Sequence, residues 1–305
     1  MSIRPVTKIS HASPAIEGAG VHLHRAFGFG DTAASDPFLL FDDFRNNDPR
    51  LYSKGFPWHP HRGIETITYV LAGEVDHGDS LGNTGTLGAG DVQWMTAGSG
   101  IIHQEMPRGD AAGAMHGFQL WANLPSSKKM TDPRYQDIPS GEIPEVTEDD
   151  GTKVRIITGE FWGKRGPVEG IAADPRYLDI SVPPGKERFF KIDLTHNAFA
   201  YVFAGSGSFR GASDPFLAPT EYVNAEGTTE ALPSHPVENR NLVLFDRGDE
   251  VLVRAGEDGI RFLLVSGQPL KEPVAWHGPI VMNSQGEIRQ ALSDLQTGNF
   301  LRTSQ

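Results

Sequence analysis

Short runs of apolar and polar residues, separated by glycine, recur through the first half of the chain. Four such runs cover residues 65–71, 90–95, 101–106 and 117–122. Many of these positions alternate with a period of two, which places every second side chain on one face, as in a β-strand. Strands at such short intervals, with glycine turns between them, are typical of a β-sandwich or barrel. The pattern therefore predicts an all-β fold.

A second β-rich region covers residues 154–267. Between the two regions, residues 125–150 are rich in proline, serine, lysine and acidic residues, which indicates a loop and linker. We therefore expect two domains, at residues 1–135 and 136–305. A short amphipathic helix is expected near the C-terminus, from apolar residues spaced i, i+3, i+4 and i+7: Ile288, Ala291, Leu292 and Leu295.

The two β-rich regions resemble copies of one unit. Tyr-Val-x-Ala-Gly occurs at residues 69–73 and at 201–205, an offset of 201 − 69 = 132. The Gly-Asp and Ala-Gly pairs of residues 90–98 recur at 248–256, an offset of 248 − 90 = 158. Two blocks in the same order favour a duplicated β-domain with an insertion between the blocks of the second copy. Chance recurrence of turn residues is the alternative.

Composition narrows the chemistry. The net charge is −12 and no run of five basic residues occurs, which argues against direct binding to nucleic acid. No apolar stretch approaches the roughly 18 residues of a membrane span, and the N-terminus lacks the apolar core of a signal peptide, so we expect a cytoplasmic protein. The chain has no cysteine, which excludes disulfides and thiolate chemistry. Any metal must be held by histidine and carboxylate side chains.

The strongest chemical pattern is a pair of His-x-His and His-x-Glu motifs. His59 and His61 are two residues apart, so in an extended segment they share one face, and Pro60 favours that extended form. His103 and Glu105 share a face in the same way. Three imidazoles and one carboxylate suit Fe(2+), Mn, Ni, Co, Cu or Zn. The alternative interpretation is that the two motifs are unrelated pairs of exposed side chains that bind no metal.

Other histidines give weaker patterns. His22 and His24 form another His-x-His, but no matching pair accompanies them, so we expect no metal there. His77 lies in the polar segment Asp-His-Gly-Asp-Ser, which indicates a solvated turn.

The motif around His59 resembles a known family. Gly55-x3-His59-x-His61-x3-Glu65-x7-Gly73 is close to the first cupin motif, and residues 56–107 as a whole are similar to a pirin. The opening Gly20-Val21 and the tail at residues 278–291 also resemble pirins. The resemblance implies two tandem cupin barrels, each a double-stranded β-helix. It also implies Fe(2+) in the N-terminal barrel, held by four side chains: His59, His61, His103 and Glu105.

According to the same resemblance, Glu65, a ligand in other cupins, is not one here. The N-terminal cupin, residues 1–135, would bind the metal. The C-terminal cupin, residues 136–305, would lack ligands, because the offsets carry His59 to Lys191 and His103 to Arg261. The segment around residues 211–241 is longer than the usual family loop.

Two functions follow from the resemblance. The first is a quercetin 2,3-dioxygenase that cleaves a flavonol-like small molecule with O2, in which Glu105 also accepts the proton of the acidic substrate hydroxyl. The second is a metal- or redox-sensing binding module that regulates partner proteins as a transcriptional or metabolic co-regulator. The sequence names no protein partner.

Overall fold

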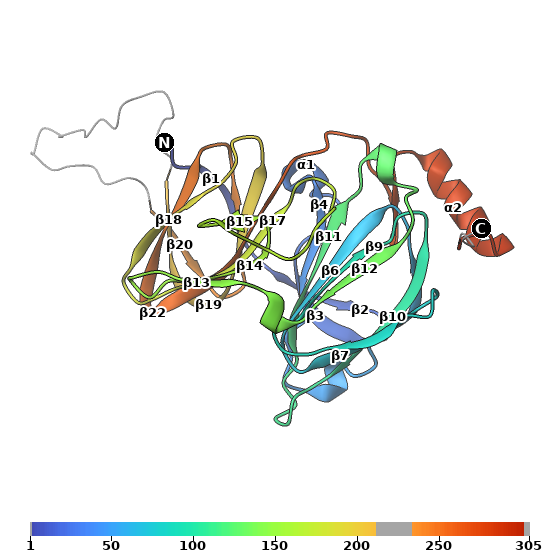
Figure 1. Cartoon of the computed structure of the whole chain (residues 1–305), viewed down its shortest axis with the longest axis horizontal. Helices are drawn as coiled ribbons and strands as arrows, with labels where there is room; N and C mark the ends of the chain where they lie inside the picture. Colours follow the sequence, from blue (N-terminus) through green and yellow to red (C-terminus); the bar gives the residue numbers. More distant parts are fainter. Residues whose placement is uncertain (1, 212–233, 302–305) are drawn as a thin grey trace, which may run out of the picture. The chain divides into compact units, whose positions relative to one another are not determined.

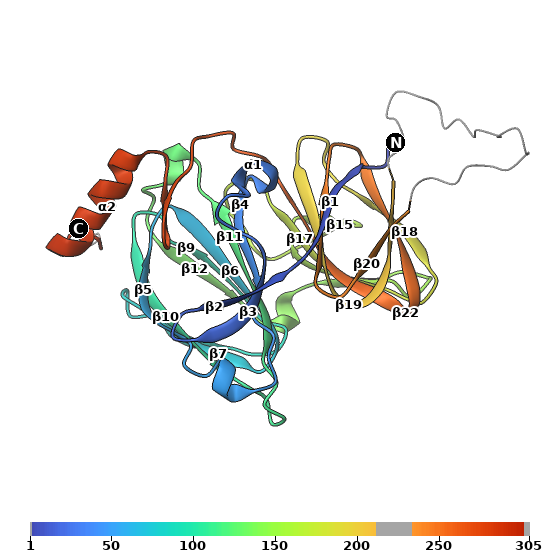
Figure 2. The same ribbon diagram turned by 180° about the vertical axis from the view of Figure 1, so that it is seen from behind.

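The computed structural model describes residues 2–211 and 234–301, which are folded mostly into β-strands (Figure 1 and, from behind, Figure 2). The predicted all-β fold with two β-domains and a short C-terminal helix is confirmed. The strands fall into two compact units, called here the N-terminal and the C-terminal barrel.

The N-terminal barrel comprises residues 12–143, 167–174 and 270–301. Its larger sheet has the order β12 (Arg134–Ile138), β9 (Val92–Thr96), β6 (Ile64–Ala72), β11 (His116–Asn123), β4 (Phe38–Asp43), β3 (Val21–Phe27) and β2 (Ser13–Glu17). Its smaller sheet has the order β5 (Phe56–His61), β10 (Ile101–Arg108), β7 (Glu74–Asp79) and β8 (Thr84–Leu87). The remaining elements are α1 (Thr32–Ser35), the 3-10 turns η1 (Pro49–Leu51), η2 (Ser126–Lys128) and η3 (Ser140–Glu142), the hairpin β23 (Ala275–His277) and β24 (Ile280–Met282), and helix α2 (Gln285–Thr297).

The C-terminal barrel comprises residues 2–11, 144–166, 175–211 and 234–269. Its sheet has the order β1 (Val6–His11), β21 (Asn241–Phe245), β19 (Asn197–Arg210), β22 (Glu250–Gly267), β17 (Arg176–Val182), β14 (Lys153–Thr158) and β13 (Glu145–Thr147). In addition, β18 (Glu187–Lys191) pairs with β22, β20 (Ser234–Glu238) pairs with β19, and a small hairpin joins β15 (Glu160–Phe161) to β16 (Lys164–Arg165).

The two barrels are not consecutive along the chain, which differs from a single division after residue 135. Residues 6–11 form β1, which pairs with β21 of the C-terminal barrel. The expected boundary falls inside β12, which pairs with β9 and extends the larger sheet of the N-terminal barrel. Composition marks a polar segment, but strand pairing between distant residues decides to which barrel it belongs.

The first block of the predicted repeat occupies equivalent strands in the two barrels, but the second block does not. Tyr69 pairs with Val92 of β9, and Tyr201 pairs with Leu242 of β21, so these strands correspond with an offset of 242 − 92 = 150. The offset of 158 is therefore wrong. Gly-Asp and Ala-Gly pairs are common at turns, and they recur here at positions that do not correspond.

Strand register also identifies the counterpart of Glu105. His77 pairs with Glu105 on the ladder between β7 and β10, which has no register shift, and Phe209, which lies 209 − 77 = 132 residues further on, pairs with Val253. The counterpart of Glu105 is thus Val253, and the same offset of 253 − 105 = 148 carries His103 to Val251. Both valines are buried in the apolar core of the C-terminal barrel.

The sequence insertion lies between the counterparts of β7 and β8. Residues 212–233 of the segment expected at 211–241 are outside the described residues. Within that segment Ser234–Glu238 form β20, which pairs with β19, so the segment is not a loop throughout.

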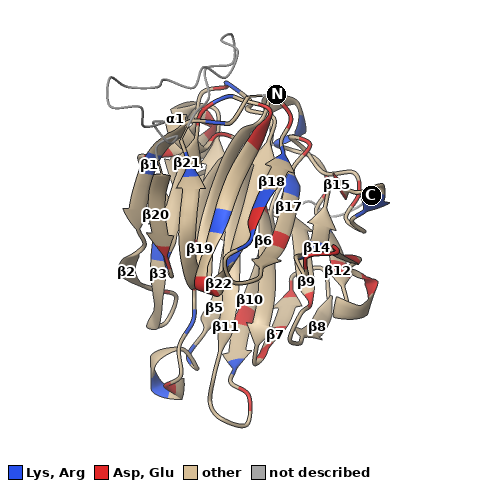
Figure 3. Cartoon of the chain, turned by 90° about the vertical axis from the view of Figure 1, so that its left-hand side faces the viewer, with Lys and Arg blue, Asp and Glu red and all other residues tan. Residues whose placement is uncertain are grey.

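Opposite charges face each other on the surface strands of the C-terminal barrel, where Figure 3 shows basic and acidic segments beside each other. Glu187 of β18 lies opposite Arg254 of β22, and Lys191 lies opposite Glu250. Cross-strand pairs of opposite sign stabilise a sheet modestly. The charges of these four residues therefore balance across the two strands.

Helix α2 is the helix predicted near the C-terminus from the spacing of apolar residues. Its N-cap residue, Ser284, accepts a hydrogen bond from the backbone N–H of Glu287, and Gly298 ends it in the left-handed conformation. Ile288 and Ala291 are buried. Neither α-helix of the described residues has the length and apolarity needed to cross a bilayer.

Lys129 is a buried lysine that joins three segments of the N-terminal barrel. The residue is only 1% exposed. Its Nζ donates to the carbonyl oxygen of Gly63 at 2.8 Å, to Oδ1 of Asn123 at 2.5 Å and to the carbonyl oxygen of Val281 at 2.9 Å. All three hydrogens of the ammonium are therefore used.

We expect Lys129→Met to lower the free energy of unfolding by about 3 kcal/mol, because each buried acceptor left unsatisfied costs about 1–3 kcal/mol. Methionine keeps the length of the stem and removes the ammonium. Urea unfolding followed by tryptophan fluorescence measures the change. Lys128→Met, at the exposed neighbouring position, is the control and should change the stability by less than about 0.5 kcal/mol. Equal effects of the two substitutions would contradict the role of Lys129.

Candidate metal centre and cavity

The structure brings three of the four predicted ligands together. His59 and His61 lie on β5 and His103 on β10, and these antiparallel strands pair with His103 directly opposite His59. One ring nitrogen from each of the three imidazoles lies within 4.8 Å of the other two. The Nε2 atoms of His59 and His61 are 3.0 Å apart.

The hydrogen bonds of these imidazoles fit a shared cation. Nδ1 of His59 lies 2.9 Å from the carbonyl oxygen of Pro57, and Nδ1 of His61 lies 3.3 Å from that of Pro279. With a hydrogen on each Nδ1, both Nε2 atoms present lone pairs to each other. Two nitrogens at right angles on one ion, each about 2.1 Å from it, are about 3.0 Å apart. The observed separation agrees with that arrangement.

His103 gives a second indication of the same kind. It is 1% exposed, and neither of its ring nitrogens has a hydrogen-bond partner among the described residues. A buried polar group without a partner is costly, and ligation of an ion would satisfy it. Burial, together with the neighbouring imidazoles, holds the pKa of His61 and of His103 well below its usual value. Both rings are therefore neutral at neutral pH, as metal ligation requires.

Residues 62 and 63 fix the end of β5. Arg62 is 3% exposed, and its guanidinium donates to the carbonyl oxygens of Ser99 at 2.6 Å and Phe300 at 2.9 Å and pairs with Asp294 at 2.7 Å. Gly63 has φ +79°, and a Cβ there would meet the carbonyl oxygen of Val281 at 2.0 Å. Glycine is therefore required where the chain leaves His61.

Glu105, the fourth predicted ligand, lies outside the group of three. It is 8% exposed, and its Oε1 accepts a hydrogen bond of 3.0 Å from Oγ1 of Thr68. Burial raises the pKa of the Glu105 carboxyl. Glu105 lines the same cavity as His59.

Glu65 also lies outside the group of three. Its Oε1 accepts a hydrogen bond of 2.8 Å from Oγ1 of Thr96. His22 and His24 alternate on β3 with Leu23 and Arg25, which line the cavity, so the two histidines belong to the other face of the strand.

The expectation of a solvated turn at His77 is wrong. His77 lies within β7, is 7% exposed and pairs in register with Glu105. Its ring stacks on Tyr135, with 6.1 Å between the ring centroids. The polar residues around it indicated a turn, but pairing with β10 on one side and β8 on the other makes the segment a strand.

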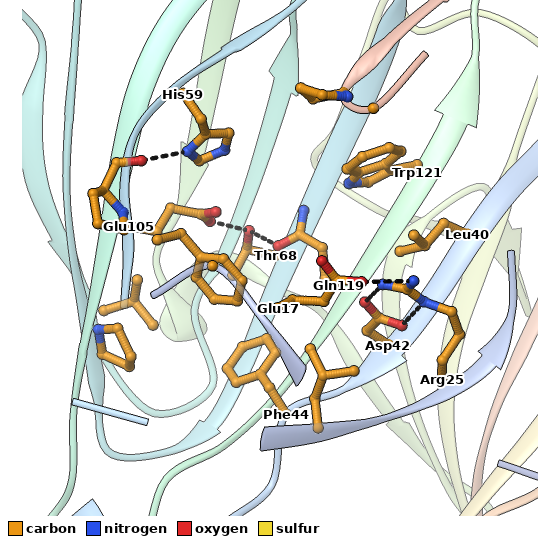
Figure 4. A pocket seen from close by; sticks show the side chains of 18 of the residues that line it. Glu17, Arg25, Leu40, Asp42, Phe44, His59, Thr68, Glu105, Gln119 and Trp121 are labelled. Carbon is orange, nitrogen blue, oxygen red and sulfur yellow. Dashed lines mark hydrogen bonds and ion pairs between the residues drawn. The ribbon is translucent and has the colours of Figure 1, made fainter. Parts of the chain in front are cut away.

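A cavity of about 530 Å³ begins at His59 and Glu105. Its walls are mainly apolar and include Leu40, Phe44, Trp121 and Trp276. Figure 4 shows His59 and Glu105 on one side of it and Arg25 and Asp42 on the other, with Thr68 and Gln119 between. A cavity of this size and lining takes a small, largely apolar molecule.

A hydrogen-bonded series connects the two sides. Oγ1 of Thr68 lies 3.0 Å from Oε1 of Glu105 and 2.9 Å from Oε1 of Gln119. One hydroxyl has a single hydrogen, so it cannot donate to both oxygens. When the Glu105 carboxylate takes that hydrogen, the Gln119 amide is satisfied if it turns its NH2 to Thr68 and its oxygen to the cavity. Sequence analysis identified neither residue, since no motif contains them.

Comparisons with known proteins identify the family of the chain. A model of the Pirin family matches residues 20–122, and a model of the pirin C-terminal cupin domain matches residues 177–301. A pirin-like protein of Caulobacter vibrioides is 41% identical over 301 residues, covering 98% of this chain and 100% of that protein. A Pseudomonas aeruginosa protein whose name proposes a quercetin 2,3-dioxygenase is 40% identical over 299 residues, covering 97% of each.

Solved structures give the same result. The crystal structure of quercetin 2,3-dioxygenase from Acinetobacter baumannii matches with a TM-score of 0.82 and 30% sequence identity, covering 98% of each chain. The matches in sequence and in structure extend over both barrels. The chain belongs to the pirin family.

Proposed function

We propose that this protein is a metal-dependent dioxygenase that cleaves flavonols such as quercetin with O2. The observation that carries the proposal is the convergence of three imidazoles within 4.8 Å beside a cavity of about 530 Å³ with aromatic walls. The name of the Acinetobacter structure and that of the Pseudomonas relative support the same substrate class.

In this proposal His59, His61, His103 and Glu105 hold one Fe(2+) ion. Neutral imidazoles and a carboxylate suit divalent iron, and they also suit Mn, Ni, Co, Cu and Zn, so the choice of iron rests on the family resemblance. When bound, the ion acts as a Lewis acid that polarises and orients the oxygen atoms of the substrate.

The residues around the cavity supply the rest of the chemistry. Glu105 accepts the proton of the acidic substrate hydroxyl on its carboxylate, and the hydrogen bond from Thr68 holds that carboxylate in place. Trp121 and Trp276 line the cavity, with their ring centroids 6.1 Å apart, and they exclude water from the bound ring.

To test this function, the protein is purified anaerobically, loaded with iron and mixed with quercetin in air-saturated buffer. We expect O2 consumption in an oxygen electrode together with bleaching of the flavonol absorption band. Protein treated with a chelator should do neither, because the site then lacks its Lewis acid.

If the protein turns quercetin over no faster than the free metal ion does, whichever metal is loaded, the proposed enzymatic function is contradicted. The binding module would then be favoured, and pull-down of partners that survives loss of the metal would support it.

His103→Ala should abolish metal binding, since it removes one of three converging imidazoles. We expect about one transition ion per wild-type chain by elemental analysis and less than about a tenth of that in the variant. His22→Ala is the matched control and should keep the full metal content. A metal-free but folded His22→Ala protein, with a metal-loaded His103→Ala protein, would show that the ligands have been misassigned.

Glu105→Gln separates the two roles proposed for the carboxylate. Glutamine keeps the shape and an oxygen ligand but removes the charge and most of the basicity. If Glu105 is the base, the refilled variant should be slower per bound metal by roughly the 10²–10⁴-fold that is typical of a lost general base. The quantity to measure is the activity divided by the metal content. Wild-type activity per metal would reduce Glu105 to a ligand.

A further inference from the structure

Three charged side chains meet at the side of the cavity opposite His59 and Glu105. Glu17 ends β2, Arg25 lies on β3 and Asp42 on β4, which are neighbours in the larger sheet. All three line the cavity, and Figure 4 shows Arg25 and Asp42 joined by two dashed lines. Neither the metal centre nor the series through Thr68 involves them.

Three of the five N–H groups of Arg25 are directed at carboxylates. Its Nε and Nη2 donate to Oδ1 and Oδ2 of Asp42 at 2.8 and 2.7 Å, and its Nη1 lies 2.8 Å from Oε1 of Glu17. The edge formed by Nε and Nη2, which can bind a carboxylate or sulfate through two hydrogen bonds, is thus occupied by Asp42, whose side chain is 6% exposed. Displacing a buried partner leaves its charge unpaired, which is strongly unfavourable.

The group carries two carboxylates and one guanidinium, and hence one net negative charge. Each carboxylate has about four lone-pair positions, and the bonds to Arg25 use only part of them. Burial raises the pKa of Asp42 to about 6, so the group keeps this charge above that pH. About five lone-pair positions (8 − 3) remain free against two N–H groups of Arg25 (5 − 3), so the free capacity of the group is mainly for accepting hydrogen bonds.

The walls between the two sides suit a flat ring. Trp276 stands edge-on to Phe29 at 5.5 Å and lies 6.1 Å from Trp121, whose ring is in turn edge-on to His61 at 5.2 Å between centroids. Aromatic side chains in such offset and edge contacts favour an aromatic ligand. A ring system that reaches from the imidazoles to Arg25 would thus end at a cluster of acceptors.

We propose that Glu17, Arg25 and Asp42 form a specificity subsite that accepts hydrogen bonds from adjacent phenolic hydroxyls on the remote ring of the substrate. The same subsite rejects substrates that carry an anionic group on that ring. This inference rests on the proposed function for the end of the substrate that reacts.

The test is an anaerobic titration of the metal-loaded protein at pH 7.5, read by quenching of tryptophan fluorescence. The probes are quercetin, galangin, which lacks hydroxyls on the remote ring, and quercetin 3′-sulfate. We expect the wild type to bind quercetin about tenfold more tightly than either of the other two, as hydrogen bonds to charged groups allow.

Glu17→Gln removes the net charge of the subsite without changing its shape. It should weaken the binding of quercetin by about fivefold and leave the binding of galangin unchanged. It should strengthen the binding of quercetin 3′-sulfate, because repulsion of the anion is relieved. Glu74→Gln is the matched control: Glu74 is half exposed, pairs with Arg108 at 2.9 Å and does not line the cavity. It should leave all three affinities unchanged.

Equal binding of the three probes by the wild type, or an equal shift of all three in Glu17→Gln, would overturn the subsite. Because oxygen is excluded, the titration reads recognition and not turnover. Intact discrimination in a protein that fails to consume O2 would therefore support the subsite and contradict only the proposed dioxygenase.

Discussion

The pairing of β5 with β10 is the interaction on which the candidate metal centre depends. It places His103 directly opposite His59, and the extended form of β5 brings His61 to the same face. A slip of one residue would turn every side chain of one strand to the other face and separate the imidazoles. Arg62 and Gly63, immediately after β5, hold the strand end in place: Arg62 by hydrogen bonds to carbonyl oxygens, and Gly63 because a Cβ there would clash with Val281.

Burial then sets the chemistry of the site. It keeps His61 and His103 neutral and so ready to act as ligands. On the other side of the cavity Arg25 is paired with two carboxylates, of which the Asp42 side chain is 6% exposed. Imidazoles at one side and an acceptor-rich group at the other make the two ends of the cavity chemically different, and Thr68 and Gln119 form a polar connection between them.

The two barrels show how one architecture supports different interiors. In the N-terminal barrel, β10 carries His103 and Glu105. At the corresponding places of the C-terminal barrel, Val251 and Val253 pack with Phe262 and Phe190 in an apolar core. A fold of this kind does not imply a site, because the site depends on a few inward-facing residues.

The sequence by itself determined the local features: strands from alternation, helix α2 from its periodicity, and the paired motifs of His59, His61, His103 and Glu105 from side-chain spacing. It misread His77, the second block of the repeat and the division between the barrels. Each of these depends on which strands pair, and pairing joins residues far apart in the chain, as β1 with β21. The cluster of Glu17, Arg25 and Asp42 has no sequence signature for the same reason. Only the tertiary structure brings together side chains from three strands, because hydrogen bonding between strands, and not spacing along the chain, decides which residues become neighbours.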